Sequence, residues 1–127
     1  MNVAFRPAQP GDFDYCERLY FAEMERINRE LKLDRDLQVA SFRRQWEPAQ
    51  VRIIMLDGAD IGWLQSTTRD GAFFLGQLFI EASGQRRGIG TAVMNRLIGE
   101  ATKMIVAGFL PRRYHRWPAP EGITGTT

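Results

Sequence analysis

The chain has 127 residues, of which 44% are hydrophobic, and this composition is typical of one globular domain with a core of its own. A net charge of +2, with basic residues scattered along the chain, argues against a nucleic-acid partner. Because no apolar run could span a bilayer and no signal peptide opens the chain, we expect a cytoplasmic protein without a membrane partner. Cys16 and His115 are the single cysteine and histidine, so we expect neither a disulfide framework nor a bound metal.

The first half of the chain predicts one strand followed by two helices. Residues 2–6 alternate in the manner of a short strand, which a proline then ends. Across residues 13–31, apolar side chains recur every three or four positions, as on one face of a long helix. The same spacing over residues 39–46 predicts a second, shorter amphipathic helix.

The middle of the chain predicts three antiparallel strands. Residues 51–56 are apolar and β-branched, the Asp-Gly pair at 57–58 favours a tight turn, and residues 61–67 supply the returning strand. After a second turn, residues 72–80 are apolar on both faces, which is typical of a strand in the centre of a sheet. Gly76 interrupts this strand and indicates a bulge or a close approach of another backbone.

A glycine-rich loop follows the central strand. Residues 85–91 read Gln-Arg-Arg-Gly-Ile-Gly-Thr and lead into an amphipathic stretch that we expect to be helical to about Gly108. Glycine lets a backbone approach a ligand, and the first amides of a helix have no intrahelical acceptor, so they can point at an anion. The loop has neither the Lys-Ser/Thr pair of a Walker A loop nor the three glycines of a dinucleotide fingerprint. It therefore predicts a phosphate site of another kind.

The pattern Gln-x-x-Gly-x-Gly that starts at Gln85, with the strand before it, resembles the acetyl-CoA-binding motif of the GNAT superfamily of N-acetyltransferases. The order of elements resembles that family over about residues 1–103. The resemblance implies an α/β (α+β) fold with a mixed, mostly antiparallel central sheet flanked by helices. Within a single domain of residues 1–127, residues 104–127 do not match, and their prolines and arginines predict an irregular tail in place of the usual C-terminal strands. The central strand would then keep an open edge, so we expect a homodimer that pairs there.

The resemblance also implies how acetyl-CoA is held. The backbone amides from Arg86 to Thr91 would cradle the pyrophosphate, the two arginines would lie near the phosphates, and the last strand residues would pair with the pantetheine. The cofactor-binding residues predicted in this way are Leu78, Phe79, Ile80, Gln85, Arg86, Arg87, Gly88, Ile89, Gly90 and Thr91.

The catalytic residues are less well defined. The family transfers acetyl directly to a primary amine, so a base must take a proton from the amine and an acid helps the CoA thiolate to leave. The candidates for the base are Glu23, Glu25, Glu81 and a water held by Gln77. The acid is unassigned, because many family members take it from a segment that has no match here. Aromatic side chains that could line an acceptor pocket, although core packing explains their spacing equally well, are Tyr15, Tyr20 and Trp63.

Two functions are consistent with this sequence. The first is an N-acetyltransferase that uses acetyl-CoA and acts on a primary amine of a small molecule or peptide. The second is a truncated GNAT-like module that binds CoA or a partner but is catalytically impaired, and turnover of acetyl-CoA distinguishes the two. A different phosphate-binding protein with a parallel sheet is disfavoured by the two hairpin turns. The sequence does not identify the acceptor amine.

Overall fold

A computed structural model describes residues 2–69, 72–84, 88–100, 104–106 and 123–125. The helices are α1 (Phe13–Glu30), α2 (Arg35–Gln45) and α3 (Ile89–Glu100), with short 3₁₀ turns η1 (Pro10–Asp12), η2 (Pro48–Gln50) and η3 (Ala82–Gly84). The strands are β1 (Val3–Pro7), β2 (Val51–Leu56), β3 (Ala59–Arg69), β4 (Ala72–Ile80), β5 (Met104–Val106) and β6 (Ile123–Gly125). They form one sheet in sequence order, antiparallel from β1 to β4 and parallel from β4 to β6.

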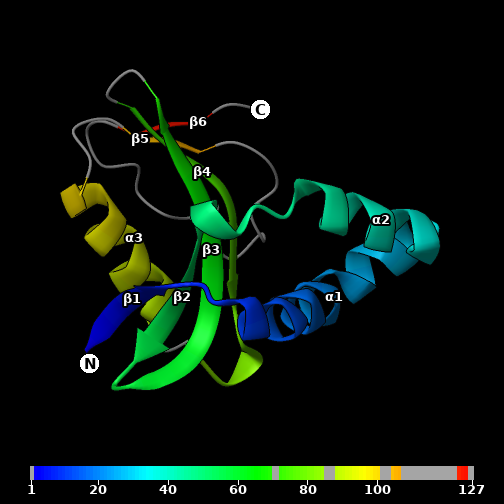
Figure 1. The fold of residues 1–127 in the computed structure, drawn as a ribbon, viewed down its shortest axis with the longest axis horizontal. Helices are drawn as coiled ribbons and strands as arrows, with labels where there is room; N and C mark the ends of the chain where they lie inside the picture. Colours follow the sequence, from blue (N-terminus) through cyan, green and yellow to red (C-terminus); the bar gives the residue numbers. More distant parts are fainter. Residues whose placement is uncertain (1, 70–71, 85–87, 101–103, 107–122, 126–127) are drawn as a thin grey trace.

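The sheet is covered on both faces. Figure 1 shows α3 on one side of it and α1 with α2 on the other. The α3 side buries an aliphatic core that includes Leu64, Leu78, Val93 and Leu97. The opposite side buries an aromatic core in which Trp63 and Phe79 of the sheet meet residues of both helices. The predicted fold class, a mostly antiparallel sheet flanked by helices, is therefore confirmed.

The turn between β2 and β3 has the geometry that its sequence predicts. Leu56 pairs with Ala59, so Asp57 and Gly58 form a two-residue loop. Both have positive φ, 50° and 86°, as a type I′ turn requires. Asparagine, aspartate and glycine tolerate this region best, which explains why an Asp-Gly pair stands here.

The predicted bulge lies at Gly76. Gln65 pairs with Gln77 while the next residue of β3, Ser66, pairs with Leu75, so Gly76 is one extra residue on β4. The bulge changes the alternation of side chains along the strand. Leu75 belongs to the aliphatic core on the α3 side, whereas Gln77 shares the opposite face with Phe79.

The C-terminal part differs from the prediction. Helix α3 ends at Glu100 and does not continue toward Gly108; Met104–Val106 instead form β5, parallel to Phe73–Leu75 of β4. The expectations that a fifth strand is missing and that residues 104–127 are irregular throughout are therefore wrong for β5 and β6. Residues 107–122 lie outside the described part of the chain. The apolar Met-Ile-Val run fits helical spacing, but it also supplies a short strand that pairs with the backbone of β4.

Candidate functional site

The N-terminus of α3 begins at an exposed glycine, Gly88. The Gly88 carbonyl oxygen accepts the first helical hydrogen bond, from the Ala92 amide at 3.0 Å, so the amides of residues 89–91 precede it and have no intrahelical acceptor. Gly88 has φ 74°, and a Cβ built there would meet no atom within 4 Å. The Ile89 side chain is buried and anchors this turn to the core. Gln85, Arg86 and Arg87 lie outside the described residues.

The loop also depends on close packing at Gly84. A Cβ on Gly84 would lie 2.5 Å from Cδ1 of Ile61 and 3.1 Å from Cδ1 of Ile89. Real Cβ atoms do not approach that closely, so a side chain on Gly84 would displace the side chains of Ile61 and Ile89. The glycine thus lets these two side chains pack tightly against the loop.

The backbone of β4 is oriented so that alternate residues face its two neighbours. The Glu81 amide donates to the Ile61 carbonyl at 2.8 Å, and a Cβ built on Gly62 would strike the carbonyl oxygen of Phe79, so Phe79 and Glu81 face β3. The backbone groups of Leu78 and Ile80 consequently face the other side of the strand.

Strand β5 covers only the first part of that side. It pairs with Phe73–Leu75, and among the described residues no strand lies beside residues 76–80 there. The two strands are thus paired at one end of β4 only. Of the three residues predicted to pair with a pantetheine, Leu78 and Ile80 face this side, and Phe79 turns its carbonyl toward β3.

Trp63 and Tyr20, two of the three aromatic residues predicted to line an acceptor pocket, belong to one aromatic cluster. Phe79 joins them, with its ring centroid 5.2 Å from Trp63 and 5.4 Å from Tyr20. Trp63 is fully buried, and its Nε1 has no hydrogen-bond partner in the part of the chain that the structure describes. Tyr20 is half-buried, which raises the pKa of its hydroxyl. In this structure Trp63 is a core residue, while Tyr20 keeps part of its surface exposed.

The two carboxylates predicted as weak candidates for the base occupy different places. Glu81 is half-buried directly after β4, and it lies near Tyr15, whose pKa is raised by burial and further by the Glu81 charge. Among the described residues, no group meets hydrogen-bond geometry with the buried Tyr15 hydroxyl, although Glu81 lies close enough to interact with it. Glu23 lies eight residues beyond Tyr15 on α1, about 12 Å along the helix axis. Glu25 forms an exposed ion pair with Arg29 at 2.6 Å.

A row of glutamines was not predicted as a unit. Gln65 is 8% exposed, and its Nε2 donates to the Gln45 carbonyl oxygen at 2.9 Å and to Oε1 of Gln50 at 3.0 Å. Gln77, on β4, donates from its Nε2 to Oε1 of Gln65 at 3.4 Å. A signal was present in the sequence, because the alternation of residues 61–67 places Gln65 on the same face as Trp63, where a polar side chain needs partners.

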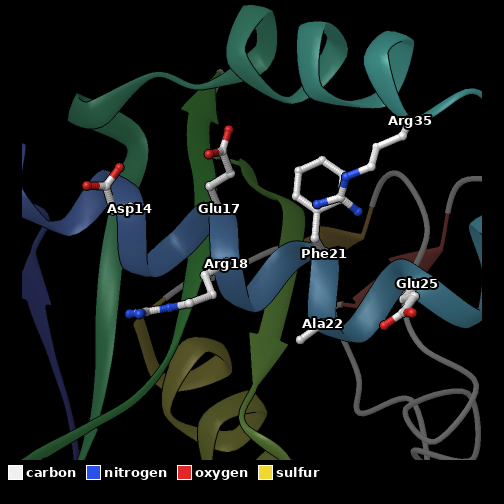
Figure 2. A pocket seen from close by; sticks show the side chains of 7 residues that line it. All are labelled: Asp14, Glu17, Arg18, Phe21, Ala22, Glu25 and Arg35. Carbon is white, nitrogen blue, oxygen red and sulfur yellow. The ribbon is translucent and has the colours of Figure 1, made fainter.

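A groove of about 490 Å³ runs along α1 beneath the start of α2 (Figure 2). Its lining residues are Asp14, Glu17, Arg18, Phe21, Ala22, Glu25 and Arg35. The Arg35 guanidinium lies over the Phe21 ring, 4.5 Å from its centroid, and Glu17 pairs with Arg43 at 3.1 Å. Apart from Glu25, none of the predicted site residues lines this groove.

Two kinds of feature are absent from the described residues. No helix in this part of the chain has both the length and the apolar character needed to cross a bilayer. The same residues hold no group of three or more His, Cys, Asp or Glu side chains that could bind a metal ion.

No protein-family model matches the sequence, and no curated protein matches it. Solved structures do match in fold. A GNAT family acetyltransferase from Brucella melitensis, in complex with acetyl-CoA, has a TM-score of 0.56 at 17% identity over 92% of this chain and 82% of its own. Apo YjaB from Escherichia coli has a TM-score of 0.62 at 11% identity, covering 82% of this chain and 69% of its own.

A proposed acetyltransferase from Pyrococcus horikoshii has a TM-score of 0.53 at 21% identity over 78% of this chain. This chain spans about a third, 34%, of that protein's length. Together these likenesses show that the chain has a GNAT-like fold, and the resemblance predicted from the glycine-rich loop is confirmed at the level of the fold.

Proposed function

We propose that the chain is a cytoplasmic N-acetyltransferase that moves acetyl from acetyl-CoA to a primary amine of a small molecule or peptide. One observation carries the proposal: the N-terminus of α3, whose first amides have no intrahelical acceptor, follows a strand that β5 covers only as far as Leu75. An anion site next to the part of the β4 edge beyond Leu75 suits a ligand that has a pyrophosphate at one end and an amide-containing arm at the other. The acetyl-CoA complex of the Brucella melitensis relative supports this choice of donor.

Separate parts of the chain would bind the donor, stabilise the developing charge and accept the proton. The amides of residues 89–91, at the positive end of the α3 dipole, would bind the pyrophosphate. The backbone of Leu78 would pair with the pantetheine and direct the thioester toward the bulge at Gly76. Backbone donors near the bulge would stabilise the negative charge that develops on the thioester oxygen as the amine attacks. Glu81, or a water molecule, would accept the proton of the amine.

Calorimetric titration with acetyl-CoA tests the donor site, with Gly88→Asp and Gly88→Asn as a matched pair. Both side chains must adopt the left-handed backbone at Gly88, which Asn and Asp tolerate similarly, and neither meets an atom within 4 Å of its Cβ. They differ in charge alone. We expect Gly88→Asp to weaken binding at least about tenfold, since a like charge faces the pyrophosphate, and Gly88→Asn to bind nearly as the wild type does.

Equal losses in both variants would show that backbone strain, not charge, decides the result, and would argue against a pyrophosphate at this loop. Binding without turnover over a panel of amines would favour the alternative function, a catalytically impaired CoA-binding module. No binding to the wild type would contradict the acetyltransferase and would leave only a module that binds a partner.

The predicted homodimer has less of the β4 edge available than expected. Because β5 lies beside residues 73–75, a second chain would pair with the β4 edge at Leu78, which the proposed function assigns to the pantetheine. Pairing there would compete with acetyl-CoA. Light scattering at micromolar concentration should therefore give a dimer that dissociates as CoA is added, and a monomeric mass without CoA would contradict the prediction.

A further inference from the structure

The glutamines that cross the sheet next to the bulge form a chain of hydrogen bonds with a fixed direction. This series of hydrogen bonds begins at the backbone carbonyl of Gln45, at the end of α2. It passes through the carboxamide of Gln65 on β3 and ends at the carboxamide of Gln77 on β4. Gln50, on η2, accepts the second hydrogen of the Gln65 amide. The middle member is 8% exposed, so its polar atoms depend on these partners.

The direction of the chain follows from the chemistry of its first group. A backbone carbonyl can accept a hydrogen bond but cannot donate one, so the Gln65 carboxamide must present its nitrogen to Gln45. Its oxygen then faces Gln77, which must present its own nitrogen in return. The Gln77 oxygen is consequently turned away from Gln65. A carbonyl at the end of α2 thereby sets the orientation of an amide on a different element.

Gln77 occupies the residue after the bulge, on the face of the sheet that α1 and α2 cover, and it is half-buried. We infer that Gln77 positions the substrate amine. Gln65 holds the Gln77 side chain so that its carbonyl oxygen can accept one hydrogen bond from the amine beside the bulge. This inference rests on the proposed function. The Gln77 oxygen would favour a substrate group that carries N–H or O–H donors and would disfavour a carboxylate.

A neutral acceptor suits an amine nucleophile in particular. A carboxylate at this position would stabilise the ammonium form, which cannot attack a thioester, and so would raise the pKa of the substrate amine. A carboxamide oxygen binds the N–H without adding a charge. The hydrogen bond of 3.4 Å between Gln77 and Gln65 is the longest of the three in this network. We expect it to shorten when the Gln77 oxygen accepts a further hydrogen bond, because linked hydrogen bonds polarise one another.

The orientation can be tested in the wild-type protein without any ligand. With ¹⁵N-labelled protein, the side-chain NH₂ protons of Gln65 should show nuclear Overhauser effects to α2 and η2, and those of Gln77 should show them to Gln65. Effects from the Gln77 NH₂ group to the bulge instead of Gln65 would mean that the amide has the opposite orientation and would overturn the inference.

The role is tested by kinetics with acetyl-CoA and the amine of the panel that is turned over best. Gln77→Leu should raise KM for the amine about tenfold, the loss expected for one hydrogen bond to a charged or polar donor, and should leave the Kd of acetyl-CoA unchanged. Gln65→Leu should act in the same direction by releasing Gln77. The control Gln38→Leu removes a carboxamide from α2 outside the chain of hydrogen bonds and should change neither constant.

An unchanged KM in a folded Gln77→Leu protein that turns over the amine would overturn the inference while leaving the proposed function in place. If the wild type binds CoA without turnover, butylammonium chloride is titrated into the CoA complex and the Gln77 side-chain amide is followed. A saturable shift that Gln65→Leu abolishes supports the inference, and no saturable shift overturns it. Failure of acetyl-CoA to bind the wild type overturns the proposed function and the inference with it, whereas the other negative outcomes overturn the inference alone.

Discussion

The substitution Gly62→Ala should destabilise the protein and displace the strand that forms the donor site. Gly62 lies on β3 opposite Ile80. A Cβ built there would be in hard contact with the carbonyl oxygen of Phe79, 3.2 Å from its carbonyl carbon and 3.1 Å from the Ile80 Cα. All of these atoms are backbone, so no rotamer change can relieve the contact. The two strands must separate locally.

Overpacking of a well-packed interior costs about 1–3 kcal/mol. If the separation also weakens the neighbouring bond between the Glu81 amide and the Ile61 carbonyl, we add about 1 kcal/mol. The sum of roughly 2–4 kcal/mol is a large part of the roughly 5–15 kcal/mol that stabilises a typical domain. For a chain of this length it corresponds to a fall of roughly 10 °C in Tm.

Gly76→Ala is the matched control, since it makes the same change on the facing strand. A Cβ there would lie 3.5 Å from the Gln65 carbonyl oxygen, an ordinary contact, so we expect a change of less than about 0.5 kcal/mol in the free energy of unfolding. Urea unfolding followed by tryptophan fluorescence measures both variants. Equal stability of the two proteins would refute the packing argument, and normal acetyl-CoA binding by a strongly destabilised Gly62→Ala would separate the packing from the site.

The parts of the fold that the sequence predicted correctly rest on local signals. The Asp57-Gly58 pair can adopt positive φ at both positions, and this fixed the first hairpin. Gly76 interrupts an otherwise apolar strand, and this located the bulge. The strand β5 is a different case, because three residues pair in parallel with Phe73–Leu75, about thirty positions earlier in the chain, and their spacing also fits a continuation of α3. Nothing local distinguishes the two outcomes.

The site was predictable to the extent that it is built from consecutive residues. Gly88 opens α3 as the motif indicates. The glutamine chain required the register that pairs Gln65 with Gln77, together with the position of the last carbonyl of α2, and both depend on tertiary packing. For Trp63 the sequence left core packing and the lining of a pocket equally open, and its full burial favours core packing. The periodicity of a strand predicts on which face of the sheet a side chain lies but not how deeply it is buried.

Two further predictions concern pH. The Arg6 guanidinium, 2.8 Å from Asp12, holds the pKa of that carboxyl below its usual 3.8, so this stabilisation is present above pH 3.8 and is lost as pH falls through the lower folded value. Arg6→Gln should lower the free energy of unfolding by about 1 kcal/mol at neutral pH, because the ion pair is partly exposed. The urea midpoint of the variant should also depend less on pH in acid than that of the wild type, and an unaltered dependence would contradict this prediction. Burial raises the pKa of the Cys16 thiol from 9.0 to about 12. Because the unfolded thiol ionises above pH 9.0 while the folded one stays protonated, stability should be complete below that pH and should fall as pH rises toward 12. In Cys16→Ala, stability should no longer fall between pH 9.0 and 10.0, the range that lies below the ordinary pKa of tyrosine. The wild-type thiol should react with Ellman's reagent only when the protein unfolds. Rapid labelling of the folded protein would show that Cys16 is accessible, and the buried position of this helix face on the sheet would then be wrong.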